Sequence, residues 1–174
     1  MIRSRRGRAA LLVLCAILLL AVAYSVKSFT PPIFAENSIA ELRSLMVNGD
    51  EQFLLIRGID TNSPVLLFLH GGPGMPATYL AHDFQRELEK RFVVVHWDQR
   101  ASGKSFKVDT DPRKLSTSVL LSDTDVVVDF LRDQFETERL WLVGHSHGAY
   151  LGVLYARRYD EKVCAFVGVG QVTN

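Results

Sequence analysis

Gly144-His145-Ser146-His147-Gly148 directly follows the apolar run 140–143 and precedes a helical pattern, and no other part of this 174-residue sequence is as informative. A serine between a strand and a helix takes a strained backbone conformation that projects its hydroxyl out of the turn. Its neighbours across the bend must be small, which explains Gly144 and Gly148. The pattern predicts a nucleophile elbow with Ser146 at its tip; the alternative is an ordinary glycine-rich turn.

Two further apolar runs end in loops that suit a catalytic site. The run 65–69 is continuous, as in strands buried on both faces of a parallel sheet, and it ends in His70-Gly71-Gly72-Pro73-Gly74. Glycines there let main-chain N–H groups approach a substrate without a Cβ in the way. The run 92–97 ends in Asp98-Gln99-Arg100 and a polar loop. Because parallel strands end at a common edge, the three loops predict a site there.

The three motifs together resemble a known family. Their order, HGGPG, then DQR-x-x-G-x-S, then G-x-S-x-G, is similar to that of α/β-hydrolases of the proline iminopeptidase (prolyl aminopeptidase) type, from about residue 38 to the end. The resemblance implies a serine hydrolase that cleaves an N-terminal residue, often proline, from a peptide, or a related amide or ester. It also implies that Gly71 or Gly72 and the residue after the nucleophile, His147, supply the N–H groups of an oxyanion hole.

This sequence departs from the family pattern at two places. Ala101 stands where the family has a glycine after DQR, and His145 and His147 flank the serine where the family more often has Gly and Trp. An elbow with these histidines looks more like that of an esterase. A carboxylesterase or lipase-like hydrolase is therefore the second reading.

The other residues of these motifs are expected to shape the site. His70 is expected to hold its loop by hydrogen bonding, and Asp98 and Arg100 to brace the site from behind as a pair, although direct substrate binding is the alternative. Ser102 and Ser105 are expected to be hydrogen-bonding loop residues. The full set of bracing and elbow positions is His70, Pro73, Gly74, Asp98, Gln99, Arg100, Gly144, His145 and Gly148.

The groups that would activate the serine are missing from the sequence. In this fold the chain order is Ser, then Asp or Glu, then His. After Ser146 the only acids are Asp160 and Glu161, at the end of the predicted elbow helix, and no histidine follows His147. His82 reads as a surface residue and His96 as a satisfied interior one. We expect a fragment of a longer chain or a truncated gene product, inactive alone; an inactive, membrane-tethered domain is the non-enzyme alternative.

Composition narrows the remaining possibilities. A formal net charge of +1 does not suggest a nucleic-acid partner, and the chain suits one domain. Cys15 lies in an apolar segment and Cys164 in a predicted buried strand, so no mutual disulfide is expected. Without CxxC or HxxxH, neither a metal site nor a cofactor is expected. The partner is expected to be a small peptide, amide or ester, while its identity and the oligomeric state stay open.

The N-terminus predicts export. Residues 1–8 carry four arginines, and residues 9–26 contain no charge, about the ~18–20 residues that span a bilayer. The arginines orient this segment with its N-terminus in the cytoplasm, which makes a single-pass cell-membrane protein with an extracytoplasmic domain. The alternative is a signal peptide cleaved after a small-x-small site at 21–23, giving a secreted protein. Residues 27–37 read as a linker and 38–174 as the partial hydrolase domain.

Hydrophobic periodicity supplies the remaining elements. Asn48-Gly49-Asp50 predicts the turn of a hairpin between strands at 40–47 and 52–57. One helix is expected at 79–90, with Leu80, Phe84 and Leu88 on one face, and another at about 116–135, with 127, 128, 130 and 131 buried. A final strand is expected at 163–169. The prediction is an α/β-hydrolase fold with a mostly parallel sheet, of which about six of eight strands are present, preceded by a transmembrane or signal helix.

Overall fold

The computed structural model describes residues 2–26 and 30–171. The chain divides into two units, residues up to Pro31 and residues from Pro32 onward, which we treat separately. Part of the expected linker, residues 27–29, lies outside the described residues.

The first unit contains one helix, α1 (Ile2–Val26), which covers the apolar run 9–26. Its large apolar side chains are exposed, with Leu12 at 71% and Leu20 at 70%. Among the described residues, no helix is both long and apolar enough to cross a membrane. The expected transmembrane segment is therefore without structural support.

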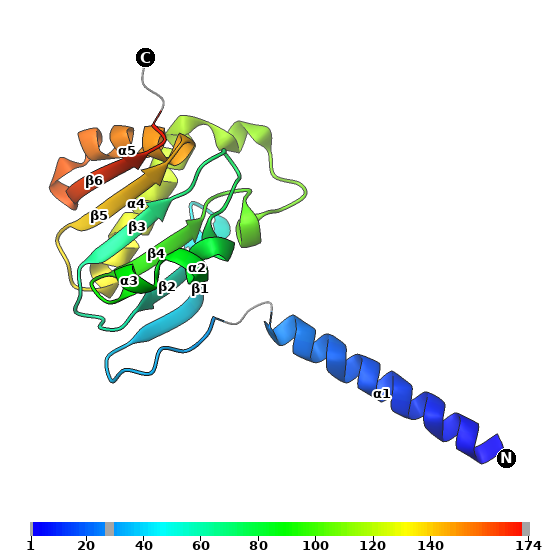
Figure 1. Ribbon diagram of the computed structural model, residues 1–174. Coiled ribbons are helices and arrows are strands. Elements are labelled where there is room, and N and C mark those ends of the chain that lie inside the picture. The colour runs from blue at the N-terminus through cyan, green and yellow to red at the C-terminus, as the bar shows by residue number, and fades with distance from the viewer. Residues whose placement is uncertain (1, 27–29, 172–174) are drawn as a thin grey trace. The chain divides into compact units, whose positions relative to one another are not determined.

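The second unit is built on a six-stranded sheet in the order β1-β2-β4-β3-β5-β6 (Figure 1). The first two strands form an antiparallel hairpin, β2 pairs antiparallel with β4, and the neighbours from β4 to β6 are all parallel. The predicted mostly parallel sheet is thus confirmed. The strands are β1 (Ile39–Val47), β2 (Asp50–Gly58), β3 (Val65–Leu69), β4 (Val93–Asp98), β5 (Leu140–His145) and β6 (Val163–Val169).

The hairpin turn forms because two adjacent residues accept a left-handed backbone. Asn48 has φ 47° and Gly49 has φ 81°, the combination that matches the twist of two antiparallel strands. Asp50 already belongs to β2, so the turn is one residue shorter than predicted.

One face of the sheet is covered by α4 (Thr117–Gln134) and α5 (His147–Arg158). Side chains at alternate strand positions, such as Leu67, Val95 and Leu142, are fully buried there against apolar residues of α4. The predicted core positions Val127, Val128 and Leu131 are all inaccessible, and Phe130 packs at the edge of this core. This layer contains the main hydrophobic core.

The opposite face carries a structure that differs from the prediction. The expected single helix at 79–90 is instead three short segments, η1 (Thr78–Leu80), α2 (Ala81–Phe84) and α3 (Arg86–Glu89). In Figure 1, α2 and α3 lie in front of the sheet and α4 lies behind it.

The buried face of these segments also differs from the apolar spacing. The buried positions are Ala81, Gln85 and Glu89, whereas Leu80 is 41% and Phe84 47% exposed. The reason is the buried Arg57 guanidinium on β2, whose Nε lies 2.7 Å from Glu89 Oε1. Gln85 and Glu89 therefore occupy the inward positions, whereas Leu80 and Phe84 face a cavity.

A second correction concerns Cys164, which was expected in a buried strand. It is exposed, because β6 forms the edge of the described sheet. Cys15 is also a free, exposed cysteine.

Candidate active site

The predicted elbow has the expected geometry. Strand β5 ends at His145 and α5 begins at His147, so Ser146 occupies the turn between them. Ser146 has φ 52° and ψ −116°, a conformation that non-glycine residues rarely adopt. Its N–H donates a hydrogen bond to Val169 O at 2.9 Å, which ties the turn to the end of β6.

Close packing explains the glycines at the elbow. A Cβ on Gly144 would lie 2.4 Å from Gly148 O, and a Cβ on Gly148 would lie 2.0 Å from Leu69 O. Neither position has room for a side chain. Gly144 is therefore required by the tight turn within the elbow itself, and Gly148 by the contact between the elbow and the end of β3.

The HGGPG loop, residues 70–74, packs directly on the elbow. A Cβ on Gly71 would lie 3.0 Å from His145 Nδ1 and 3.3 Å from Ser146 Cβ. Gly72 has φ 116°, and the loop closes with a hydrogen bond from Met75 N to Gly71 O at 3.2 Å. Within the described residues, no hydrogen bond is donated by Gly72 N or His147 N. Two unused donors next to a serine suit an oxyanion.

His70 holds this loop, as predicted. Its Nδ1 lies 2.9 Å from Gly71 O, and its Nε2 lies 2.9 Å from Ser102 Oγ and 3.2 Å from Gln99 N. A neutral ring with the proton on Nδ1 accounts for the contacts with Gly71 O and Gln99 N, because Nδ1 then donates to the carbonyl and Nε2 accepts from Gln99 N–H. Burial lowers the pKa of His70, which favours this neutral form.

Asp98 connects three segments at the end of β4. Its Oδ1 accepts a hydrogen bond from Thr78 Oγ1, and its Oδ2 accepts one from Lys104 N at 2.8 Å. Gly103 is pressed against this carboxylate, since a Cβ there would lie 2.2 Å from Oδ2. Ala101, where the family has glycine, has φ 59° and therefore strains the same loop.

Arg100 braces the loop without Asp98, which corrects the expected Asp–Arg pair. The Arg100 Nε lies 2.8 Å from Asp123 Oδ2 on α4, and Arg100 Nη1 forms an ion pair with Asp50. Asp123 is fully buried and was missed from the sequence. The available signal was its place four residues before the buried Val127, on the inward face of α4.

The loop serines behave as predicted. Ser102 Oγ donates to Gln99 O at 2.6 Å, and Ser105 Oγ donates to Asp98 O at 2.5 Å. Ser105 Oγ also accepts from Phe53 N at 3.0 Å. Both hydroxyls therefore fix the loop after β4.

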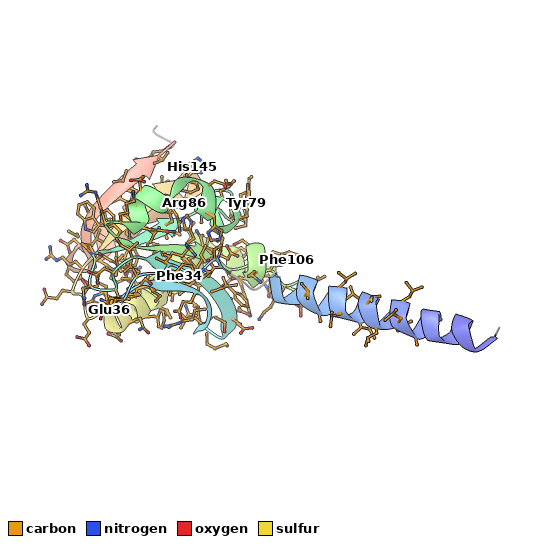
Figure 2. The ribbon with its side chains drawn as sticks, turned by 60° about the horizontal axis from the view of Figure 1, so that its bottom comes forward. Phe34, Glu36, Tyr79, Arg86, Phe106 and His145 are labelled. Carbon is orange, nitrogen blue, oxygen red and sulfur yellow. The ribbon has the colours of Figure 1, made fainter. Side chains whose placement is uncertain are left out.

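A cavity of about 580 Å³ opens beside Ser146. Figure 2 labels two of its lining residues, Tyr79 and His145, and shows them on the same side of the domain. The cavity brings together the elbow, the HGGPG loop and η1. Its lining residues are Phe68, His70, Gly71, Gly72, Met75, Pro76, Ala77, Tyr79, Leu80, Phe84, His145, Ser146 and Val169.

The remaining histidines differ in their surroundings. His96 is 2% exposed and stacks on Phe68 with 4.7 Å between ring centroids. Its Nε2 has no hydrogen-bond partner among the described residues, so the predicted satisfied histidine is only half confirmed. Burial lowers the pKa of His96 to about 4. Within the part of the chain that the structure describes, the buried Nδ1 of His147 also has no hydrogen-bond partner, and its ring centroid lies 6.1 Å from that of Tyr150. His82, read as a surface residue, is half-buried.

Metal ligation has no basis in the part of the chain that the structure describes. No group of three or more His, Cys, Asp or Glu side chains there could hold a metal ion.

Comparison with known proteins gives the family of the fold. Residues 64–174 match the model of the alpha/beta hydrolase fold. The probable aminopeptidase YbaC of Bacillus subtilis is 37% identical over 139 residues, which cover 80% of this chain and 44% of that protein. A proline iminopeptidase of Lactobacillus helveticus is 27% identical, over 66% of this chain and 37% of that protein.

Solved structures agree on the fold. The proline iminopeptidase-related protein of Thermus thermophilus superposes with a TM-score of 0.67 at 29% identity, covering 78% of this chain and 46% of that one. An epoxide hydrolase of Vigna radiata superposes with a TM-score of 0.62 at 26% identity, covering 74% and 39%. The chain thus spans less than half the length of the relatives it matches.

Proposed function

The chain belongs to the α/β-hydrolase family, and on this premise we propose that it carries the nucleophile and oxyanion hole of a serine hydrolase. The observation that carries the proposal is Ser146, held at φ 52° between β5 and α5 and opening into the cavity formed with the HGGPG loop. The proposed reaction is hydrolysis of the peptide bond after an N-terminal residue, or of a related amide or ester. The names of the curated relatives support the peptide substrate.

In the proposed reaction Ser146 Oγ bonds to the carbonyl carbon of the substrate. The carbonyl oxygen becomes an oxyanion that accepts hydrogen bonds from His147 N–H and from Gly71 or Gly72 N–H. Loss of one such donor in related chemistry costs on the order of 10²–10³ in rate. The bond to the amine or alcohol then breaks, and water later releases the acyl group from Ser146.

The proton of the Ser146 hydroxyl needs an acceptor, which returns it to the leaving group. His70 is not suited to this, because its Nδ1 is engaged by Gly71 O and its Nε2 by Gln99 and Ser102 in the loop after β4. We propose that the base, and the carboxylate that orients it, lie outside these 174 residues. On this proposal the isolated chain has essentially no turnover.

A carboxylesterase is the second candidate. It is favoured by the elbow histidines, His145 and His147, and by the apolar lining of the cavity next to Ser146. An inactive domain with a binding role is the non-enzyme candidate.

We also propose that residues 9–26 direct the chain to the cell membrane, either as an uncleaved anchor or as a signal peptide. The support is the uncharged run after the four arginines of residues 1–8. Carbonate extraction of the expressed protein distinguishes the two. An anchor stays in the membrane pellet, whereas recovery of a soluble chain beginning near Tyr24 identifies a signal peptide.

Labelling with a fluorophosphonate probe tests the serine. We expect rapid labelling in a form extended through a downstream acid and histidine, complete loss in Ser146→Ala, and no labelling of residues 1–174 alone. Ser118→Ala, which removes an exposed hydroxyl outside the cavity, is the matched control and should label normally. Labelling that persists in Ser146→Ala contradicts the assigned nucleophile. Rapid labelling of the 174-residue chain contradicts the external base.

A further inference from the structure

Large apolar side chains surround the cavity beside Ser146. Met75 and Tyr79 are each 70% exposed, Phe84 is 47% exposed and Leu80 41%, and all four line this one cavity. Single exposed apolar residues are normal on a protein surface, but a cluster around a cavity marks a binding site. The cluster adjoins the nucleophile, so a molecule bound there lies next to the reacting bond.

The floor of the cavity is held rigid from below. Phe68 stacks on the buried His96 at 4.7 Å, and Phe84 meets the same imidazole edge-on at 5.9 Å. Phe68 and Phe84 also contact each other, with 6.2 Å between ring centroids. Three mutually packed rings leave an aromatic surface whose shape changes little when a ligand binds.

One wall of the cavity is tied to the end of β4 by a part-buried side-chain hydrogen bond. Thr78 begins η1, the short turn that carries Tyr79 and Leu80, and its Oγ1 donates to Asp98 Oδ1. Asp98 is only 3% exposed, and Lys104 N fixes its other oxygen. The position of this wall therefore depends on Thr78 and Asp98.

The cavity offers little to a charged group. Its described lining residues include no Asp, Glu, Lys or Arg. An unpaired charge placed against apolar side chains loses hydration that none of these lining residues restores. The cavity of about 580 Å³ is also much larger than the roughly 150 Å³ that suffices to hold a benzene ring.

We infer that this cavity binds a bulky, uncharged apolar group on the carbonyl side of the scissile bond, with Thr78 as a positioning residue for its wall. For a peptide substrate that group is the side chain of the residue that supplies the carbonyl. The inference rests on the proposed function, since it takes Ser146 as the site of attack. Its substrate class includes peptides and esters whose acyl part carries an aromatic or branched apolar group.

Binding to Ser146→Ala tests the inference without any turnover. The probes are phenylalaninamide, alaninamide and lysinamide, which share one amine and differ only in the side chain. Backbone amide shifts of Gly72 and His147 in NMR titrations report binding at the site. We expect phenylalaninamide to bind about tenfold or more tighter than the other two, as burial of an aromatic side chain implies.

A fourth probe, 3-phenylpropanamide, has the same ring without the amine. Tighter binding than phenylalaninamide favours the carboxylesterase, and weaker binding favours the aminopeptidase; either order supports the apolar cavity, provided both exceed alaninamide. Equal affinities across the side-chain series, or tighter binding of lysinamide, overturn the inference.

Variants locate the binding site. Leu80→Asp should weaken phenylalaninamide about tenfold, whereas Leu115→Asp, at a residue 36% exposed and outside the cavity, should not. Thr78→Val should weaken phenylalaninamide while alaninamide is unaffected, and Thr78→Ser should restore the difference. If both probes weaken equally, or if Thr78→Ser fails to restore it, Thr78 is not a positioning residue.

The outcome is separable from that of the proposed function. Loss of fluorophosphonate labelling in Ser146→Ala concerns the nucleophile alone, while the titrations use a protein that lacks this hydroxyl. A preference for phenylalaninamide in Ser146→Ala, together with no fluorophosphonate labelling of Ser146 in the extended form, leaves the apolar site standing and rejects the hydrolase.

Discussion

The two faces of the sheet are built from the same strands but by different physical means. On the α4 and α5 face, Leu67 and Val95 lie in a layer of fully buried apolar side chains. On the opposite face, the alternate positions carry Arg57, Phe68 and His96. The first face stabilises the domain, whereas the second leads into the cavity beside Ser146.

The difference lies in how replaceable each contact is. Apolar packing is non-directional, so many neighbours share each buried side chain. The opposite face depends on specific partners: Glu89 Oε1 accepts from Arg57 Nε at 2.7 Å and from Gln85 Nε2 at 2.6 Å. Among the described residues, Gln85 Oε1 and His96 Nε2 are buried there without a partner. We therefore expect this face to be more sensitive to charge and pH than the apolar one.

The largest expected effect comes from Glu89→Leu. It removes the carboxylate from the buried Arg57–Glu89 ion pair, and loss of one member of a buried pair destabilises proteins by about 4 kcal/mol. Urea unfolding of the chain measures the loss. The control is Glu87→Leu on the same helix, where the pair with Lys90 is exposed and a change below about 0.5 kcal/mol is expected. A loss from Glu89→Leu as small as the control would show that the buried pair does not hold α3.

A pair of adjacent substitutions compares the two faces directly. Leu67→Ala opens a cavity in the apolar core and should cost about 3 kcal/mol, because Leu67 is fully buried. Phe68→Ala, one residue along β3 but facing the ligand cavity, should cost less stability and weaken phenylalaninamide binding. Urea unfolding and the NMR titration give the two readings. Equal effects on both measurements would mean that the faces share one role.

The sequence predicted the apolar face better than the polar one. Continuous apolar runs and helical spacing placed β3, β4, α4 and the elbow, because burial of apolar surface follows simple periodicity. The same spacing suggested one helix at 79–90. In the structure this segment forms short helices, turned so that Glu89 faces inward to its ion pair with Arg57.

Long-range partners account for the other errors. The motif suggested that Asp98 and Arg100 pair with each other, but they bind Thr78 and Asp123, residues 20 and 23 positions away. No local pattern encodes which of several acids a buried arginine meets. Gly144 was readable because its constraint is local: a Cβ there would meet the Gly148 carbonyl. Gly148 packs against Leu69 O on β3, and only the motif marked it in the sequence.

We expect acid to lower the free energy of unfolding by protonating His96, which lies on the polar face. Burial lowers its pKa to about 4, against an unfolded value of about 6.5. Between these two pKa values the unfolded chain binds a proton at this imidazole and the folded chain does not. The contribution of neutral His96 to the free energy of unfolding is therefore fully present above pH ~6.5 and is lost as the pH drops towards ~4. Between pH 7 and pH 5 the expected loss is about 2 kcal/mol.

The measurement compares urea unfolding at these two pH values for the chain and for His96→Leu. His70 and His82 also have lowered pKa values through burial, and Glu89 lies near the same ring, so the total pH dependence has several sources. The difference between the two proteins isolates His96. An unchanged pH dependence in His96→Leu would show that the imidazole is not held neutral by its surroundings.

The smallest effect is expected where the two faces meet, in the loop after β4. From this loop Asp98 binds Thr78 on the cavity side and Arg100 binds Asp123 on α4. Ala101, directly after Arg100, is held at φ 59°, which costs a residue with a Cβ about 1 kcal/mol. Ala101→Gly removes that strain but adds freedom to the unfolded chain, so the net gain should be about 0.5 kcal/mol.

Urea unfolding measures this small change, and a second variant at a residue with positive φ serves as the control. Glu136 also has a positive φ, 48°, but lies in the turn between α4 and β5, away from both anchors. Glu136→Gly should stabilise the chain similarly and leave ligand binding unchanged. If the two anchors determine the loop, Ala101→Gly also leaves the affinity for phenylalaninamide unchanged, because Thr78 and Asp98 hold the cavity wall independently of residue 101. A weaker affinity in Ala101→Gly would instead mean that the strained alanine helps to position that wall.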